Sequence, residues 1–199
     1  MRVLLVRHGQ SEWNASRRLQ GQADINLSDL GRAQADRLRP VIDEIGPCRA
    51  ISSDMSRVRE TADRIGAADA QYDPGLREID GGKWTGRSIG EIQAEEPVAY
   101  QGWRAGTRTP PGGETWGAFS KRVTGVIEAQ RTDPCLNLLV ACHGGVIRAV
   151  LHHYLGLPPA QVIPVAPASL TALRLGDNKP ARLELFNYRP ARLDFEAPD

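Results

Sequence analysis

The sequence predicts an α/β protein of three layers, in which a mainly parallel central sheet lies between two layers of helices. Short apolar runs that suit buried strands alternate along the chain with longer segments whose apolar residues recur at helical spacing. Two of these strands, at residues 3–6 and 137–142, are followed within three residues by a histidine and a glycine. Crossover connections make such strands parallel, so their carboxyl ends should meet at one edge of the sheet.

The first half of the chain provides two strand–helix units. In chain order we expect a strand at 3–6, a helix at 28–46, a strand at 50–52, a helix at 53–65 and a brief strand near 71–72. Ser28 is the expected N-cap of the first helix, whose apolar face should include Leu30, and Gly46-Pro47 ends it. Ser53-Asp54 is the expected cap of the second helix.

The second half continues the alternation and then changes to a hairpin. We expect a glycine-rich loop at 76–86, short helices over 88–104, a helix entered at 114–115, a strand at 137–142, a helix at 146–155 and two hairpin strands at 170–175 and 183–188. No linker divides the chain, so residues 1–199 are predicted to form one domain. The polar tail after Pro190 is expected to be poorly ordered.

Composition excludes several classes of partner. The formal net charge is +1 and the two signs are mixed along the chain, so we expect no nucleic-acid partner. No apolar run approaches the length of a membrane span. Cys48, Cys135 and Cys142 are an odd, widely spaced set without metal-ligand spacing, which predicts reduced cysteines in a cytoplasmic protein. A homodimer is compatible with the sequence, which does not define the oligomeric state.

The predicted strand ends bring together side chains that suit a phosphoryl group. Arg7 and His8 follow the first strand, His143 follows the strand at 137–142, Arg57 lies in the first turn of a helix, and Glu78 lies on the glycine-rich loop. Arginines bind phosphoryl oxygens through two hydrogen bonds, and helix N-termini at Ser53 and Gly144 would add N–H donors. A neutral imidazole can attack phosphorus, and Glu78 can supply a proton if burial raises its pKa.

These motifs resemble the signature of the histidine phosphatase superfamily, the phosphoglycerate-mutase-like enzymes. The similar segments, in the same order and spacing, are Leu5-Val6-Arg7-His8-Gly9 with Asn14, Gly21 to Asp24 with Leu27 and Gly31, Ser52-Ser53-Asp54 with Arg57, Thr61 and Ala62, Leu76 to Ile79, Pro111 to Glu114, and His143-Gly144-Gly145. Together they extend along nearly the whole chain.

The resemblance implies roles for individual residues. His8 would be the phosphorylated nucleophile and Glu78 the proton donor, while Arg7, Arg57 and His143 would clamp the phosphate. Phosphate contacts are also expected from Asn14, Gln20, Gly21 and Gly144. The implied reaction needs neither a metal nor another cofactor, and the expected partner is a small-molecule phosphomonoester.

Within the superfamily the sequence favours a phosphatase over a bisphosphoglycerate-dependent phosphoglycerate mutase. The glycolytic mutases usually carry Thr-Gly-Trp where this chain has Gln20-Gly21-Gln22, an asparagine in place of Gly145, and a longer basic insertion before Pro110. Because this chain is shorter there, the segment that covers the pocket would be smaller. A smaller cover would make it harder to protect a phosphorylated intermediate from water. An alternative of another class, a catalytically silent phosphoprotein-binding module, is disfavoured because every catalytic residue type is present.

For some residues the sequence does not decide between a functional role and a packing role. Trp84, Trp103 and Trp116 could border a substrate mouth or pack in the core. The pair His152-His153 is not expected to bind a metal, because adjacent helical side chains point about 100° apart. Residues 84–116 are expected to contribute the contacts that distinguish substrates, and the sequence does not name the substrate.

Overall fold

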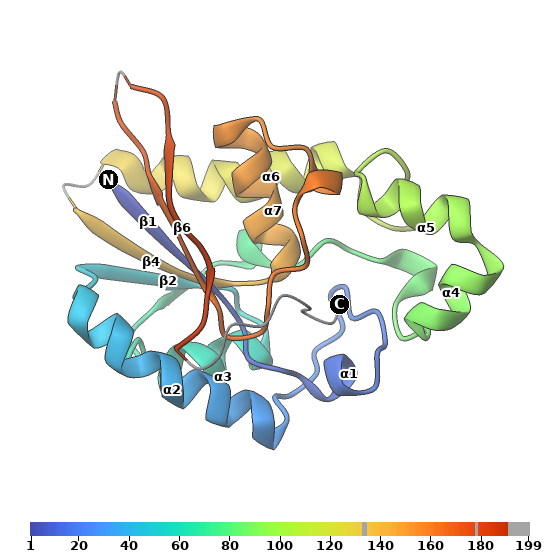
Figure 1. The fold of residues 1–199 in the computed structure, drawn as a ribbon, viewed down its shortest axis with the longest axis horizontal. Helices are drawn as coiled ribbons and strands as arrows, with labels where there is room; N and C mark the ends of the chain where they lie inside the picture. The colour runs from blue at the N-terminus through green and yellow to red at the C-terminus, as the bar shows by residue number, and fades with distance from the viewer. Residues whose placement is uncertain (133–134, 178, 191–199) are drawn as a thin grey trace.

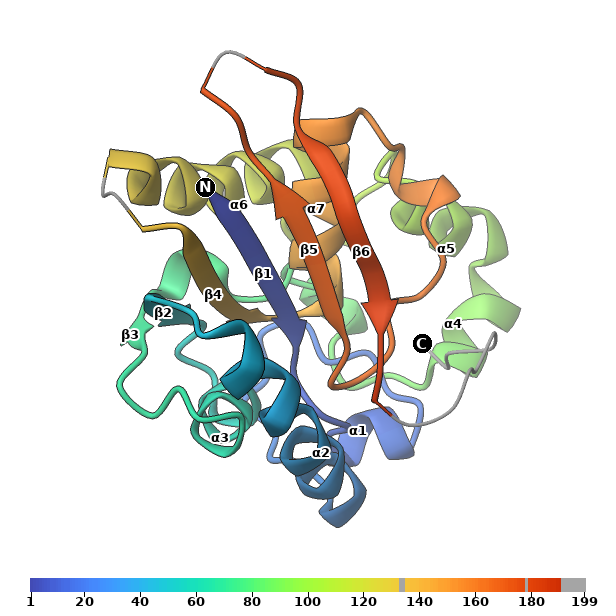
Figure 2. The ribbon, with the colours of Figure 1, turned by 60° about the vertical axis from the view of Figure 1, so that its left-hand side comes forward.

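The central sheet has six strands in the spatial order β3-β2-β4-β1-β5-β6 (Figures 1 and 2). This computed structural model describes residues 1–132, 135–177 and 179–190. The strands are β1 (Arg2–Arg7), β2 (Arg49–Ser52), β3 (Gln71–Tyr72), β4 (Asn137–Cys142), β5 (Leu170–Arg174) and β6 (Arg182–Tyr188). The first four strands of the spatial order are parallel, whereas β5 and β6 pair antiparallel. The mainly parallel sheet and the hairpin are therefore confirmed.

The described part of the chain also contains seven α-helices, and all but the short first one lie in or close to the positions that the sequence predicts. They are α1 (Glu12–Ala15), α2 (Asp29–Ile45), α3 (Ser56–Arg64), α4 (Ile89–Glu95), α5 (Pro97–Arg104), α6 (Trp116–Ala129) and α7 (Gly144–Leu155). The Ser28 side chain accepts a hydrogen bond from Gly31 N, as expected of an N-cap, and left-handed Gly46 ends α2. The break between α4 and α5 falls at Glu96-Pro97.

Alternate side chains of the strands form two cores, one on each face of the sheet. Leu5 and Val140 pack with α6 and α7 on one face, while Leu4 and Leu139 pack with α2 and α3 on the other. Figures 1 and 2 show these helix pairs on opposite sides of the strands, which confirms the three layers. Burial of each large apolar side chain contributes roughly 1.5–3 kcal/mol, so both faces stabilise the sheet.

The helices α4 and α5 form a cap that projects beside the sheet (Figure 1). A third apolar cluster holds this cap, and it is built around the fully buried Trp84 with Leu19, Ile92 and Tyr100. The ring of Trp103 meets the Trp84 ring edge-on at a centroid distance of 6.0 Å. The cap therefore has a small core of its own, and Trp103 packs against both this core and the core on the α6–α7 face of the sheet.

Two local expectations were wrong. The helix after β2 begins at Ser56, not at Ser53-Asp54, because the Asp54 carboxylate binds Arg77 instead, with Oδ2 2.5 Å from Nη2. The Asp24 carboxylate, distant in sequence, accepts from Ser56 N at the start of α3. In α2 the exposed fraction of Leu30 is 49%, and the buried residues of that helix are Gly31, Ala35, Leu38 and Ile42.

The expectation of three reduced cysteines was also wrong. Cys48 and Cys135 form a disulfide, with their Cα atoms 6.0 Å apart. They precede β2 and β4, which lie side by side in the sheet, so parallel pairing makes neighbours of two residues that are 87 positions apart. Cys142 is free, as expected, and lies buried in the core.

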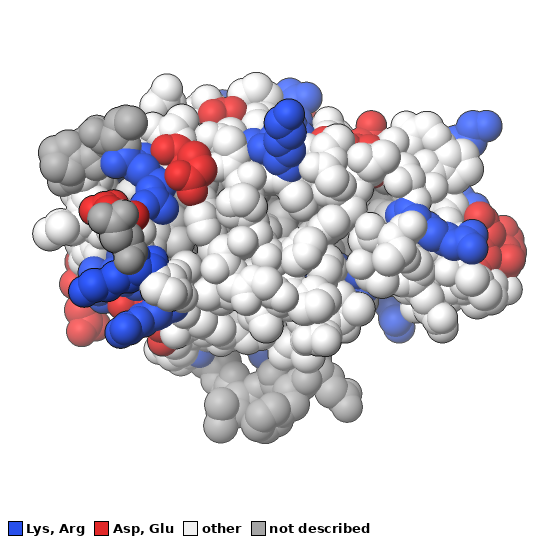
Figure 3. Space-filling view, turned by 90° about the horizontal axis from the view of Figure 1, so that it is seen from above, with Lys and Arg blue, Asp and Glu red and all other residues white. Residues whose placement is uncertain are grey.

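Three further expectations concern the surface and the ends of the chain. No helix among the described residues is long and apolar enough to cross a membrane. The tail after Pro190 and Asn178 in the hairpin turn lie outside the described residues. On the face shown in Figure 3, basic and acidic side chains lie interspersed, in keeping with the mixed charges of the sequence.

Candidate active site

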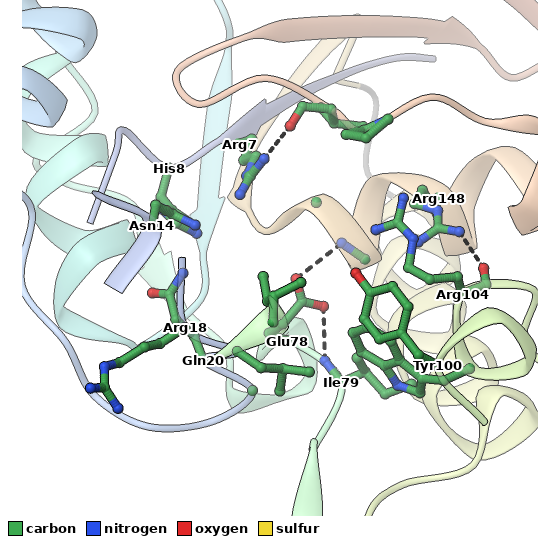
Figure 4. A pocket seen from close by; sticks show the side chains of 18 of the residues that line it. Arg7, His8, Asn14, Arg18, Gln20, Glu78, Ile79, Tyr100, Arg104 and Arg148 are labelled. Atoms are coloured by element: carbon green, nitrogen blue, oxygen red, sulfur yellow. Dashed lines mark hydrogen bonds between the residues drawn. The ribbon is translucent and has the colours of Figure 1, made fainter. Parts of the chain in front are cut away.

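The predicted site residues converge where β1, β2 and β4 end. In the sheet register Arg7 lies beside Cys142 and Ser52 beside Ala141, so the residues that follow these strands reach the same level. His8 and His143 consequently meet, with ring centroids 5.3 Å apart and planes inclined by 68°. Figure 4 shows the pocket that opens in front of His8 and Arg7.

His8 is almost fully buried and held in one tautomer. Its Nδ1 atom lies 2.7 Å from the carbonyl oxygen of Gly9. A carbonyl oxygen only accepts, so Nδ1 carries the proton and donates it, which leaves the lone pair of Nε2 available. Burial, and then the charges of Arg57 and Arg7, hold the pKa of His8 well below its ordinary value near 6.5. The imidazole is therefore neutral at pH 7, the form that can act as a nucleophile.

His143 stands behind His8 and is completely buried. Its Nδ1 lies 3.4 Å from Nη2 of Arg57, and its Nε2 lies 3.0 Å from Oγ of Ser53. Because a guanidinium only donates, Nδ1 accepts and the protonated Nε2 donates to Ser53. Burial, with Arg57 next, lowers the pKa of His143 well below its ordinary value. Ser53, expected to be a helix cap, instead orients this imidazole.

Two arginines bring positive charge to the same place. The fully buried Arg57 donates from Nη1 to the carbonyl oxygen of Ala23 at 2.7 Å and from Nη2 to that of Gly21 at 3.0 Å. Burial lowers the pKa of Arg57 to about 10, so it remains a cation at pH 7. Arg7 donates from Nη1 to Val165 O, and its guanidinium lies against Gly144 at the start of α7.

Glu78 reaches the pocket from the loop before the cap and is fixed through both carboxylate oxygens. The backbone N–H of Ile79 donates to Oε1 at 2.9 Å, and that of Gly145 donates to Oε2 at 3.0 Å. A Cβ atom at position 145 would lie 2.1 Å from Oε1 of Glu78. Only glycine at this position therefore leaves room for the carboxylate.

Asn14 and Gln20 line the pocket next to His8. Ser11 binds the carbonyl oxygens of both side chains: its N–H donates to Oδ1 of Asn14 at 3.1 Å, and its hydroxyl donates to Oε1 of Gln20 at 2.7 Å. With their acceptors engaged in this way, the two amides have their N–H groups to offer to an anion. Gly21 and Gly144 also line the pocket, whereas His143 contributes from behind it.

Thr61 connects the nucleophile loop to the helix that carries Arg57. Its hydroxyl donates to the carbonyl oxygen of Arg57 at 2.7 Å and accepts from Gly9 N at 3.1 Å. Thr61 is fully buried, and the first of these bonds lies within α3. The second bond, to the residue after His8, was not foreseen, because it joins segments that are 52 positions apart.

The pocket extends outward from these residues and encloses about 880 Å³, including its open mouth. Its outer lining includes Arg18, Tyr100, Trp103, Arg104, Trp116, Arg148 and Pro164. Trp103 and Trp116 thus border the mouth, whereas Trp84 is core. Sequence reasoning missed Arg148, although its position one helical turn after Gly144 could have indicated it. No pattern in the sequence around Arg18 indicates that this residue lines the pocket.

No group of three or more histidine, cysteine, aspartate or glutamate residues in the described ranges could hold a metal ion. The Nδ1 atom of His152 accepts a hydrogen bond from Nε1 of Trp116 at 3.0 Å. Its role in the structure is therefore to support the wall of the pocket.

Two buried histidines, two buried arginines and a glutamate at the strand ends of an α/β sheet define the class of an enzyme that handles phosphoryl groups. Comparison with known proteins agrees. The family model of the histidine phosphatase superfamily (branch 1) matches residues 3–188. The chain belongs to this superfamily.

Relatives of two kinds resemble the chain. A glucosyl-3-phosphoglycerate phosphatase of Mycolicibacterium vanbaalenii is 37% identical over 79% of this chain and 75% of its own length. A probable phosphoglycerate mutase of Salmonella paratyphi C is 36% identical over 79% of this chain and 76% of its own. The solved structure of a mycobacterial glucosyl-3-phosphoglycerate phosphatase with VO3 superimposes with a TM-score of 0.85, at 33% identity, and covers 94% of this chain and 98% of that one. The chain is a phosphatase of small phosphorylated metabolites.

Proposed function

We propose that the chain hydrolyses its phosphomonoester in two steps, through a phosphohistidine at His8 and without a metal. Nε2 of His8 attacks phosphorus as the bond from phosphorus to the ester oxygen breaks, and Glu78 gives its proton to the leaving alkoxide. Glu78 then takes a proton from a water molecule. The oxygen of this water attacks phosphorus as the bond from Nε2 to phosphorus breaks, which restores His8 and releases inorganic phosphate. The observation that carries this proposal is the tautomer of His8, whose Nδ1 bond to Gly9 O leaves Nε2 as the nucleophile.

The surrounding cations and donors would stabilise the transferring group. Arg7 and Arg57 are fixed by backbone carbonyls before any substrate binds, so they need little reorganisation as charge develops on the phosphoryl oxygens. Asn14, Gln20 and the N-terminus of α7 at Gly144 offer N–H donors to the same oxygens. We assign His143 and Gly21 to the clamp as well, His143 through its contact with His8.

Replacement of His8 by alanine tests the mechanism. We expect the variant to lose at least about 1,000-fold of its turnover on a panel of phosphomonoesters, as removal of a nucleophile does. The panel should include glucosyl-3-phosphoglycerate, because similar phosphatases are named for it. Full activity in His8→Ala would refute the phosphohistidine route.

A phosphoglycerate mutase is the second candidate, because mutase-named relatives are nearly as similar as the phosphatases. Incubation of 3-phosphoglycerate with 2,3-bisphosphoglycerate separates the two reactions. We expect release of inorganic phosphate, whereas fast isomerisation without net release would establish the mutase. Absence of turnover across the panel would instead favour the silent phosphoprotein-binding module.

The cytoplasmic location, the homodimer and the absence of a nucleic-acid partner stay predictions. The disulfide between Cys48 and Cys135 is more typical of an oxidising compartment. Cell fractionation together with thiol labelling would test the location and the redox state at once.

A further inference from the structure

The loop that carries Glu78 is held from behind by a pair of charged side chains, Glu114 and Arg122. Glu114 ends the segment Pro111 to Glu114, and Arg122 lies on α6. The described lining of the pocket includes neither residue. The guanidinium binds the carboxylate through two bonds, from Nε to Oε1 at 3.0 Å and from Nη2 to Oε2 at 2.7 Å. Two parallel bonds of this kind fix both groups in one orientation.

Arg122 also binds the backbone that leads into Glu78. Its Nη1 atom donates to the carbonyl oxygens of Gly75 at 2.9 Å and of Arg77 at 3.0 Å. The carbonyl group of Arg77 belongs to the planar peptide unit that joins Arg77 to Glu78, so this bond orients the backbone from which the Glu78 side chain projects. All three nitrogen atoms of the guanidinium are engaged in this way, and the single ammonium group of a lysine could not replace them.

Glu114 binds the backbone that follows Glu78. The N–H of Asp80 donates to Oε2 of Glu114 at 3.4 Å, and the N–H of Glu114 donates to the carbonyl oxygen of Asp80 at 3.0 Å. The Asp80 side chain in turn accepts from Gly82 N at 2.8 Å. The loop is therefore held two residues after Glu78 as well as directly before it.

The charged pair is well shielded from water. The side chains of Glu114 and Arg122 are 18% and 26% exposed, and the guanidinium carbon lies 5.2 Å from the centroid of the buried Phe119 ring. Leu76 and Ile79 of the same loop pack in the core on the α6–α7 face of the sheet. Apolar packing is not directional, whereas hydrogen bonds constrain the direction of the groups that they join. The packing thus holds the loop against α6, and the pair sets the direction of its peptide groups.

We infer that Arg122 and Glu114 are positioning residues for the proton transfer by Glu78, because they hold the backbone on both sides of it. This inference rests on the proposed function, in which Glu78 protonates the leaving alkoxide. A general acid must lie within hydrogen-bond reach of the oxygen that it protonates. A displacement of about 1 Å can cost about 100-fold in rate. Since the pair acts on the backbone of the loop, its effect on the reaction should pass through Glu78.

Two esters with different leaving groups test this role. Benzyl phosphate releases a strongly basic alkoxide that needs the proton, whereas p-nitrophenyl phosphate releases a weakly basic phenolate that needs it far less. Both carry one aromatic ring, and phosphate release measures the hydrolysis of both. The quantity compared is kcat/KM for benzyl phosphate divided by kcat/KM for p-nitrophenyl phosphate. General losses of activity cancel in this ratio, and we expect Glu78→Gln to lower it about 100-fold or more.

Variants of the pair should lower the same ratio to a smaller extent. We expect a decrease of about tenfold or more in Arg122→Met, and a smaller decrease in Glu114→Gln, which keeps the size of the side chain. Arg122→Lys keeps the charge but cannot join the carboxylate to both carbonyl groups, so it should also lower the ratio. Arg64→Met is the matched control, because Arg64 binds both oxygens of Asp36 at 3.0 Å between α2 and α3, with its side chain 32% exposed. It should leave the ratio unchanged.

The double variant Arg122→Met/Glu78→Gln shows whether Arg122 acts through Glu78. If it does, Arg122→Met should lower the ratio no further once Glu78 is replaced. A further decrease as large as the one in the single variant would reveal another route and overturn the positioning role. An unchanged ratio in both Arg122→Met and Arg122→Lys, or an equal decrease in Arg64→Met, would also overturn it.

Failure of the proposed function looks different. If Glu78→Gln lowers the ratio and the variants of Arg122 do not, only the positioning role is lost and the proposed acid catalysis stands. If Glu78→Gln leaves the ratio unchanged, or the unmodified enzyme hydrolyses p-nitrophenyl phosphate but not benzyl phosphate, the proposed acid catalysis by Glu78 is contradicted and the positioning role with it.

Discussion

The inner and outer ends of the pocket are built in different ways. At the inner end His8, His143 and Arg57 are between 0% and 3% exposed, and the register of β1, β2 and β4 positions the segments that carry them. At the outer end Arg18 is exposed and Trp103 and Arg104 are partly so, and the small core of the cap positions the latter two. The difference shows that the sheet positions the catalytic residues, whereas the cap provides side chains that line the outer end of the pocket.

Among substitutions that leave the catalytic side chains themselves unchanged, the largest effect on turnover is expected from crowding the inner end. Gly145→Ala would place a Cβ atom 2.1 Å from Oε1 of Glu78, so the carboxylate must leave its position. Since general acid–base catalysis is worth about 100-fold or more, we expect kcat to fall by at least about 100-fold. Steady-state kinetics on p-nitrophenyl phosphate and on the best ester of the panel would measure this.

Gly117→Ala is the control for this substitution. Gly117 also lies in the first turn of a helix, α6, but a Cβ atom added to it would meet nothing within 4 Å. We expect its kcat to stay unchanged and its stability to shift by less than about 1 kcal/mol. A Gly145→Ala enzyme that matches Gly117→Ala in kcat would show that Glu78 does not act from this position.

A smaller effect on turnover is expected when the hydrogen bond from Gly9 N to the hydroxyl of Thr61 is removed. This bond joins the loop that carries His8 to α3, the helix that carries Arg57. Thr61→Val keeps the shape of the side chain but leaves the buried Gly9 N–H without its acceptor. We expect the free energy of unfolding to fall by about 1–3 kcal/mol. We also expect kcat to fall severalfold because the loop that carries His8 loosens. Thermal or chemical denaturation alongside kinetics would separate the two effects, and Thr61→Ser should restore both.

Thr124→Val supplies the comparison for Thr61. Thr124 is a buried threonine of α6 whose hydroxyl donates to Ser120 O at 2.8 Å, the same bond within the helix that Thr61 makes to Arg57. Among the described contacts, Thr124 has no bond that corresponds to the one between Thr61 and Gly9 N. Equal losses of kcat in Thr61→Val and Thr124→Val would therefore remove the role assigned to the Gly9 bond.

The smallest expected effect is on stability against pH. The pKa values of His8 and His143 are lowered in the folded protein, so below about pH 6.5 the unfolded chain binds more protons than the folded one. The free energy of unfolding should therefore decrease as the pH falls through this range. Denaturation at pH 7.5 and 5.5 would show a smaller decrease in His8→Asn than in the unmodified protein, and an identical decrease would mean that His8 is protonated like an ordinary imidazole.

The inner end was largely predictable because short sequence patterns specify it. Arg7, His8 and His143 follow apolar strands, and parallel pairing then places them together without further information. The errors lie where a tertiary contact competes with a local preference. Asp54 is a good N-cap by type, but Arg77 binds it instead, and Asp24 serves the helix from elsewhere in the chain.

The outer end was less predictable for the same physical reason. The sequence indicated that residues 84–116 would matter, and Tyr100, Trp103 and Arg104 do line the pocket. Arg148 was missed because its relation to Arg104 depends on how the cap docks beside α7. The disulfide was missed because the adjacency of Cys48 and Cys135 follows from the strand order, which spacing along the chain does not reveal.

The most direct test of the central claim is detection of the phosphoenzyme. The enzyme is mixed with excess substrate, quenched in alkali within milliseconds and mapped by peptide mass spectrometry. We expect a phosphoryl group on His8 that is stable in base and lost in acid, and we expect it to be absent from His8→Asn. A phosphoryl group on another residue, or full turnover by His8→Asn, would contradict the account.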